Sequence, residues 1–91
     1  MTAWTKDPAA RLDYGADWTA WLQAGETITV STWIVTPADT LTASDESFTG
    51  GVTTVWLSGG NVGTNYRVTN QITTSDGRTD DRSLSIYVTP R

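Results

Sequence analysis

The chain has 91 residues, which is enough for one domain with a single hydrophobic core. Its formal net charge of -4 and its scattered basic residues argue against electrostatic binding to nucleic acid or to an anionic membrane. The absence of cysteine and histidine removes disulfide bonds, the usual zinc ligands, the thiol nucleophile and the commonest general base. No apolar run is long enough to span a membrane, and the amino terminus lacks the apolar core of a secretory signal. We therefore expect synthesis in the cytosol, unless the sequence has been trimmed.

The amino-terminal segment, residues 1–10, contains Trp4 and the Asp7-Pro8 step, and a residue before proline favours an extended chain. We expect an extended arm here and not a strand of the core. Trp4 then docks either on its own domain or on a neighbouring subunit, because an exposed tryptophan on an arm is unusual. Residues 11–91 are expected to form the folded domain.

The apolar residues of segment 12–22 mix two periods. Trp18 and Trp21 share a helical face, which predicts one helical turn capped by Asp17. The alternative is a pair of short edge strands bent at Gly15. Both readings place the two tryptophans at an edge of the fold.

Residues 27–35 predict a strand because they are rich in β-branched and aromatic side chains. Ile28 and Val30 face one side of it, whereas Trp33 faces the other. The inward face must therefore change along the strand, and we expect a β-bulge near residues 31–32.

The middle of the chain predicts two strands separated by a loop. The strands are expected at 41–44 and 52–57. Residues 45–51 are expected to form the loop, with Phe48 covering one end of the core. Trp56 should lie on the opposite face of its strand from its two apolar neighbours.

Two apolar runs near the carboxyl terminus predict a long β-hairpin. Residues 66–72 and 84–88 carry apolar side chains at alternate positions, and Asp76-Gly77 between them is a strong turn signal. A loop of these two residues alone would place the two apolar sets on opposite faces of the hairpin.

A three-residue loop of 75–77 instead makes Tyr66 face Ile86 and gives one continuous apolar face. We therefore predict a type I turn with Gly77 in the left-handed conformation of a G1 bulge. Direct pairing of Ser75 with Arg78 would contradict this register.

The glycine-rich corner at 57–60, Leu-Ser-Gly-Gly, precedes Tyr66. This arrangement resembles the tyrosine corner of immunoglobulin-like and fibronectin type III sandwiches, in which a tyrosine hydrogen-bonds back across the preceding connection. The resemblance implies that Leu57, Gly60 and Tyr66 form the corner; an ordinary core role for the tyrosine is the alternative. Val68 stands where antibody domains place a disulfide cysteine. Because the chain has no cysteine, the resemblance is to those sandwiches that lack this disulfide.

Counting all segments gives six or seven short strands and no long helix. Turn signals recur at the spacing typical of a Greek-key sandwich. We therefore predict an all-β, disulfide-free sandwich of the immunoglobulin or fibronectin type III kind, with an extended amino-terminal arm.

The acidic residues do not form a catalytic pattern. Asp80 and Asp81 are adjacent on a predicted strand and point to opposite faces. Asp45 and Glu46 lie in a predicted loop, but no dense set of oxygen ligands surrounds them. We predict no catalytic, cofactor-binding or metal-binding residue, and no enzyme activity.

The aromatic content indicates a contact with another chain. Nine aromatic residues, five of them tryptophans, are more than one thin core easily hides. We expect Trp4, Trp18 and Trp21 to be the candidate interface residues.

The segments DYGADWTAWL at 13–22 and WLSGG at 56–60 resemble a family of small tailed-bacteriophage virion proteins labelled fiber-tail adaptor. The resemblance implies a non-enzymatic structural protein, made in the host cytoplasm and located in the virion. It would connect the tail or neck to fibers, or decorate the capsid. Its implied partners are other virion proteins and further copies of itself, without nucleic acid, membrane or cofactor. A carbohydrate-binding or host-adhesion sandwich is the alternative.

Overall fold

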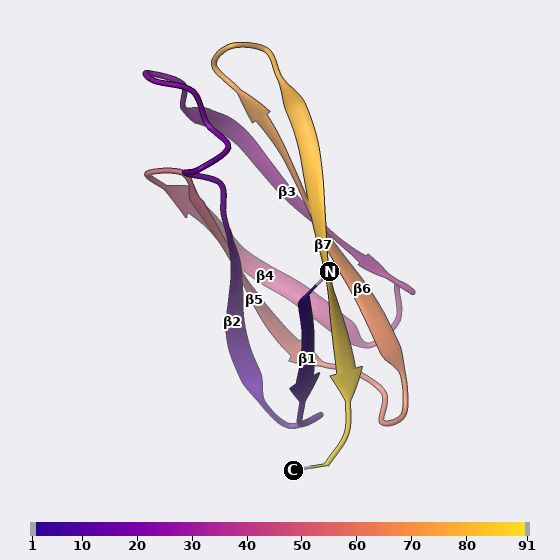
Figure 1. Cartoon of the computed structure of the whole chain (residues 1–91). Helices are drawn as coiled ribbons and strands as arrows, with labels where there is room; N and C mark the ends of the chain where they lie inside the picture. The colour runs from indigo at the N-terminus through magenta and orange to yellow at the C-terminus, as the bar shows by residue number, and fades with distance from the viewer. Residues whose placement is uncertain (1, 91) are drawn as a thin grey trace.

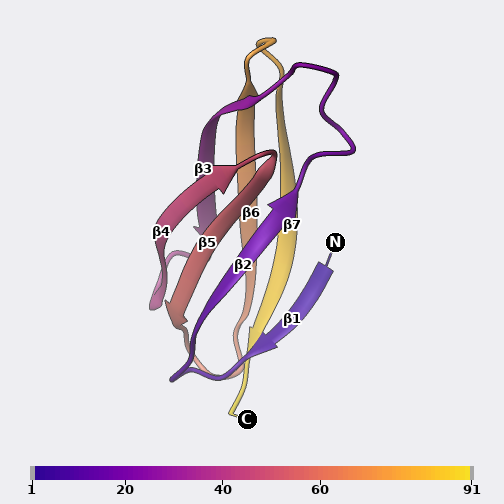
Figure 2. The same cartoon turned by 90° about the vertical axis from the view of Figure 1, so that its left-hand side faces the viewer.

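The computed structural model describes residues 2–90, which fold into two packed β-sheets (Figure 1). The seven strands are β1 (Thr2–Lys6), β2 (Arg11–Asp17), β3 (Ile28–Thr36), β4 (Leu41–Thr49), β5 (Val52–Gly59), β6 (Asn65–Thr74) and β7 (Thr79–Val88). One sheet has the order β1-β7-β6-β3 and the other the order β2-β5-β4. Figure 2 shows the three-stranded sheet crossing in front of the four-stranded sheet. The predicted all-β sandwich is confirmed.

The first strand corrects the prediction of an arm outside the sheet, which is wrong. β1 pairs in parallel with β7, from Thr2 opposite Leu84 to Lys6 opposite Val88. The Lys6 side chain is fully buried, and its Nζ donates hydrogen bonds of 2.8 Å to the carbonyl oxygens of Asp7 and Gly59. Burial lowers the pKa of this ammonium group. Residues 2–6 are therefore part of the sandwich.

The next segment combines parts of both alternatives. β2 pairs with β5 in an unbroken register, so no bend occurs at Gly15. A Cβ atom at Gly15 would lie 2.7 Å from the Thr53 carbonyl oxygen, which explains why only glycine allows this close approach. A turn follows, in which Asp17 Oδ1 accepts the Thr19 N–H at 3.0 Å. Asp17 thus caps a single turn, in which the Leu22 N–H donates to the Trp18 carbonyl oxygen at 3.0 Å, and no longer helix follows among the described residues.

The bulge of β3 occurs earlier than predicted. The register with β6 shifts between Ile28 and Val30, not near residues 31–32. As a result Ile28 and Trp33 are both buried, whereas Val30 is 49% exposed. The prediction that Val30 shares the face of Ile28 is therefore wrong.

The predicted loop at 45–51 is also wrong in part. β4 runs on to Thr49 and stays paired with β5, with a register shift between Ser44 and Ser47. Asp45 takes a φ of 51° at this irregularity. Phe48 is 41% exposed, so it does not cover the core.

The β6–β7 hairpin has the predicted register, which is confirmed by Tyr66 opposite Ile86. The Thr74 N–H donates to the Arg78 carbonyl oxygen at 2.9 Å, so three residues form the loop. The Gly77 N–H donates to the Thr74 carbonyl oxygen at 3.0 Å, and the φ of Gly77 is 79°. These values match a type I turn followed by a left-handed glycine.

The core lies between the sheets in two groups of buried side chains. The larger group fills the end near the tyrosine, and the smaller group lies toward the hairpin tip. The larger contains Trp33, Leu41, Val55, Leu57, Tyr66, Val68, Leu84, Ile86 and Val88, and the smaller contains Trp18, Ile28 and Ile72.

The Tyr66 hydroxyl spans the connection between β5 and β6. It accepts a hydrogen bond of 2.9 Å from the Asn61 N–H, the contact that the tyrosine-corner resemblance implies. It also donates to Asp39 Oδ1 at 2.7 Å, which lowers the pKa of that carboxyl group. Leu57 is fully buried, and a Cβ atom at Gly60 would lie 2.7 Å from a methyl group of Val88. Because Asp39 lies in the turn between β3 and β4, the tyrosine also holds that turn against the corner.

Deleting residues 1–6 tests the role of β1. We expect the free energy of unfolding to fall by about 3 kcal/mol or more, because the deletion removes a buried side chain and uncovers β7. Circular dichroism during urea unfolding measures the change. Trp4→Ser is the control, since it alters one half-exposed side chain and keeps the strand. Unchanged stability of the truncated chain would show that these residues lie outside the core.

Replacing Tyr66 by Phe tests the corner. The change leaves the Asn61 N–H without its partner, and we expect a loss of about 1–3 kcal/mol in the free energy of unfolding. Tyr87→Phe is the matched control, because that ring is 43% exposed, and it should change stability by less than about 0.5 kcal/mol. Equal effects of the two substitutions would contradict the role of the buried hydroxyl.

Candidate functional site

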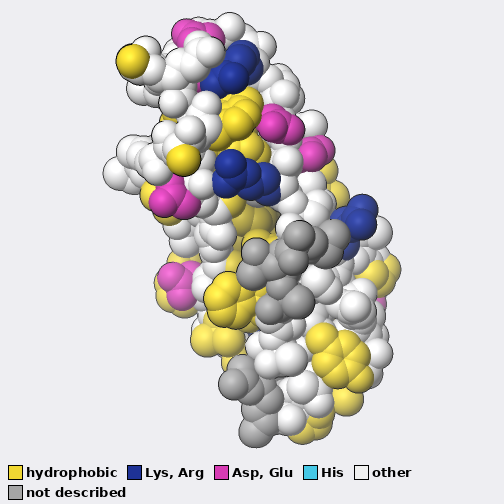
Figure 3. All heavy atoms as spheres, viewed as in Figure 1, with side chains coloured by type: hydrophobic (Ala, Val, Ile, Leu, Met, Phe, Trp, Pro, Cys, Tyr) yellow, Lys and Arg dark blue, Asp and Glu magenta, His cyan; other side chains and the backbone are white. Residues whose placement is uncertain are grey.

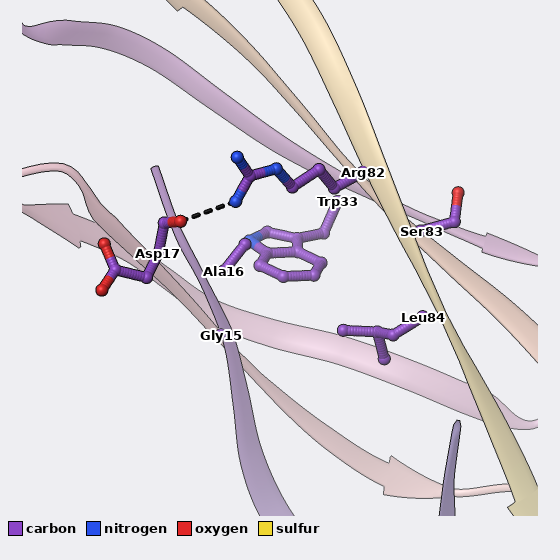
Figure 4. Close-up of a pocket in the computed structure, with 7 residues that line it drawn as sticks. All are labelled: Gly15, Ala16, Asp17, Trp33, Arg82, Ser83 and Leu84. Carbon is purple, nitrogen blue, oxygen red and sulfur yellow. Dashed lines mark hydrogen bonds between the residues drawn. The ribbon is translucent and has the colours of Figure 1, made fainter. Parts of the chain in front are cut away.

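A pocket of about 460 Å³ opens on the side of the sandwich between β2 and β7 (Figure 4). Its walls come from the two strands, and its floor comes from β3. The lining residues are Gly15, Ala16 and Asp17 of β2, Arg82, Ser83 and Leu84 of β7, and Trp33 of β3. The pocket therefore joins residues that lie far apart in the sequence.

Arg82 connects the two walls. Its Nη1 donates a hydrogen bond of 2.6 Å to the Asp17 carbonyl oxygen, and its guanidinium lies 4.1 Å from the centre of the Trp18 ring. The Asp17 carboxylate points away from Trp33 (Figure 4) and accepts hydrogen bonds from Thr19, which lower its pKa. Arg82 thus provides the positive charge at the mouth of the pocket.

Trp33 provides an unused hydrogen-bond donor. The residue is 7% exposed. Among the side chains of residues 4–90, its indole Nε1 is the one buried nitrogen or oxygen atom that has no hydrogen-bond partner. In Figure 4 the nitrogen edge of the ring faces Ala16. Trp18 differs, because its indole N–H donates to Asn70 Oδ1 at 2.9 Å. A buried donor without a partner is rare in native proteins and calls for an explanation.

The hairpin tip is fastened to the segment after β2 by an ion pair between a buried carboxylate and a partly exposed guanidinium. Arg78 pairs with Glu26, and its guanidinium lies 3.9 Å from the centre of the Trp21 ring. The hydrogen bond from Arg78 lowers the pKa of Glu26 to about 2 against the opposing effect of burial. Thr74 Oγ1 also donates to Glu26 Oε2 at 2.5 Å. Figure 3 shows dark blue cationic side chains lying over yellow hydrophobic ones in the upper part of this face.

The structure separates the three candidate interface tryptophans. Trp4 is 50% exposed, and its ring meets Tyr14 edge-on at a centroid distance of 5.9 Å. Trp21 is half-buried beneath its arginine. Trp18 is fully buried, so the prediction that it forms an interface is wrong. Its polar nitrogen finds a partner inside the domain, and the ring packs there as a core residue.

The other residues singled out in the sequence lie at opposite ends of β6. Asp76 and Gly77 form the hairpin tip, whereas Leu57, Gly60 and Tyr66 lie at the corner before the strand begins. None of these five residues lines the pocket. They hold the sandwich together at its two ends.

Sequence reasoning missed Asn70, Glu26 and Arg82. Asn70 occupies an inward position of the alternating run in β6, and a polar residue there is a signal of a buried hydrogen-bond network. The other two carry no local signal, because their partners lie in distant segments.

Within the described part of the chain, no group of three or more acidic, histidine or cysteine side chains is placed to hold a metal ion. No helix among the described residues could cross a membrane. What the surface offers is main-chain edges, apolar side chains and hydrogen-bond donors. These groups suit the binding of another polypeptide.

The fold and this surface define a small β-sandwich module of the immunoglobulin-like type. The family model described as podophage GP4 fiber-tail adaptor protein gp77 matches residues 6–87. The chain belongs to this family, so it is a structural component of the phage virion and not an enzyme. As an adaptor it contacts other virion proteins. No curated protein matches the chain.

Acid unfolding tests the Glu26–Arg78 pair. The pKa of Glu26 is about 2 in the folded chain and is ordinarily 4.5, so its stabilising effect is complete above pH 4.5 and is lost as the pH falls through about 2. We expect Glu26→Gln to lower stability at pH 7 and to flatten the decline of stability between pH 4.5 and 2.

Urea unfolding across that pH range measures the change. Glu46→Gln is the control, because it removes one carboxylate from an exposed position. A wild-type decline that survives unchanged in Glu26→Gln would show that other carboxylates cause it. The pKa values of Asp17 and Asp39 are also lowered, so protonation of these two groups should still cause a smaller loss of stability in the Glu26→Gln variant.

Proposed function

We propose that the chain joins fiber protein to the tail through protein–protein contacts on two sides of the sandwich. The family description supports this role, because it names a fiber-tail adaptor. The structure adds a reason why so small a module suits it. An adaptor must hold two partners at once, and therefore needs two separate contact surfaces.

The observation that carries the proposal is the position of the exposed hydrophobic residues. Each of the four edge strands presents at least one of them. Trp4 of β1 is 50% exposed and Leu12 of β2 is 39% exposed, whereas Ile34 of β3 is 51% exposed and Phe48 of β4 is 41% exposed. Edge strands also carry unpaired main-chain groups, which a partner strand can use.

These edges form two sides of the molecule. β1 and β2 meet where Trp4 contacts Tyr14, and β3 and β4 follow one another at the other edges of the same two sheets. One side therefore presents Trp4 and Leu12, and the other presents Ile34 and Phe48. Two such sides support the joining of two partners by one chain.

We further propose that the virion holds several copies of the chain. Two different sides allow copies to meet head to tail, and a contact of this kind closes into a ring when the rotation permits. Size-exclusion chromatography with light scattering measures the number of copies in solution and in the complexes described below.

Purified chain mixed with the fiber and tail proteins of the same phage tests the adaptor role. We expect a complex with each protein, measured by chromatography with light scattering. Ile34→Lys should abolish one complex and Leu12→Lys the other, since lysine on an edge strand opposes strand addition. Val62→Lys is the matched control, because Val62 is 58% exposed but lies in a loop. Failure to bind either protein, together with binding to a glycan, would favour the carbohydrate-binding alternative.

A further inference from the structure

Strand β7 is covered along only part of its length. β1 pairs with it from Leu84 to Val88, and among residues 2–90 no strand pairs with residues 79–82 on the side away from β6. The hydrogen bond from the Thr74 N–H to the Arg78 carbonyl oxygen fixes which groups of β7 face β6. By alternation, the N–H groups of Thr79 and Asp81 point to the uncovered side.

The uncovered edge is protected in the isolated chain. Asp80 Oδ1 accepts the Asp81 N–H at 2.8 Å, so a carboxylate takes the place of a neighbouring strand. A charged side chain on an open edge discourages random strand pairing. A specific partner strand can replace this contact with a main-chain carbonyl group.

The pocket lies directly beside the uncovered edge, since Arg82 and Ser83 line it. We call the uncovered edge and the pocket together the β2–β7 slot. Its volume of about 460 Å³ far exceeds the roughly 30 Å³ that one water occupies in the liquid, so the space accommodates a side chain. Trp33 forms part of its floor, and its Nε1 is a buried donor without a partner among the described residues.

The charges around the slot favour a neutral occupant. Within the described residues, Arg82 uses one of its five N–H groups in a hydrogen bond. Asp17 lines the slot, and Asp80 lies on the same face of β7 as Arg82, so two negative charges accompany the one positive charge. A carboxylate would therefore be repelled, whereas an amide oxygen could accept from the indole and the guanidinium.

We propose that the β2–β7 slot binds an extended segment of a partner virion protein. The segment pairs with β7 at residues 79–82 and inserts an asparagine or glutamine side chain. Its carbonyl oxygen accepts the hydrogen bond of Trp33 when the side chains that cover the buried Nε1 move aside. This inference rests on the proposed adaptor function and deepens it, because it specifies one contact surface and the chemistry of its ligand.

Nuclear magnetic resonance of the ¹⁵N-labelled chain tests the slot. The probes are the purified fiber and tail proteins and overlapping synthetic peptides that cover them. We expect one peptide to move the Trp33 indole N–H signal downfield and to slow hydrogen exchange at Thr79 and Asp81. The signal is assigned by its absence in Trp33→Phe. A Trp33 indole signal already at a hydrogen-bonded position in the free chain would overturn the proposal, because water would then satisfy the donor.

Binding by variants completes the test. Trp33→Phe should weaken the complex by about tenfold, the effect of losing one hydrogen bond at a buried donor. Asp81→Pro should weaken it without disturbing the β6 ladder, because its N–H faces the open side. Trp56→Phe is the matched control, since Trp56 lies on the outer face beneath Arg11 and away from the pocket.

The outcomes separate this inference from the adaptor function. If the wild-type chain binds fiber or tail protein and both slot variants bind equally well, the slot proposal is wrong and the adaptor function stands. If the wild-type chain binds neither protein, both proposals fail. Thermal unfolding of each variant shows whether weaker binding follows from a lost contact or from unfolding. The resonance shift and the hydrogen exchange are measured on the wild-type chain, so that part of the test does not depend on whether a variant folds.

Discussion

The buried amide of Asn70 is the interaction on which the arrangement of the two sheets depends. Its Oδ1 accepts hydrogen bonds from the Trp18 indole at 2.9 Å and the Thr53 hydroxyl at 2.6 Å. Its Nδ2 donates to Ser31 Oγ and to the Thr32 carbonyl oxygen, both at 3.0 Å. One side chain of β6 thus connects β3, β5 and the turn after β2. A shift of either sheet would leave several buried groups without partners, so only one packing satisfies them all.

The position of the pocket follows from this network. Because Asn70 holds Trp18, the guanidinium of Arg82 can stack on that ring and reach the main chain of Asp17. Because Asn70 also holds the strand at Thr32, the next side chain, Trp33, turns into the space between the sheets. The polar atoms of the Asn70 side chain therefore all have partners, whereas Trp33 Nε1, beside the pocket, has none among the described residues. Exceptions of this kind in native proteins tend to mark functional positions.

The sequence predicted those parts of the fold whose information is local. The register of the β6–β7 hairpin followed from alternating apolar residues and the chemistry of a three-residue loop ending at Gly77. The strand β1 could not be recognised, because its five residues have little apolar pattern and its parallel partner lies at the other end of the chain. The continuation of β4 depends on Asp45 adopting a positive φ, which local propensity disfavours. The pocket was not predicted, since its walls meet only through tertiary packing.

The edge strands of the sandwich carry both acidic side chains, which limit aggregation, and apolar side chains, which are available to a partner. An open edge strand invites pairing with any exposed strand, and this protein places acidic residues at such positions. Asp80 bonds the free N–H of Asp81, and Asp45 and Glu46 lie at the irregularity of the β4 edge. The apolar side chains Ile34 and Phe48 remain exposed on the neighbouring stretches of edge strand. Charge thus limits non-specific pairing while apolar contacts remain available, so a partner must match both the edge and the pocket beside it to bind tightly.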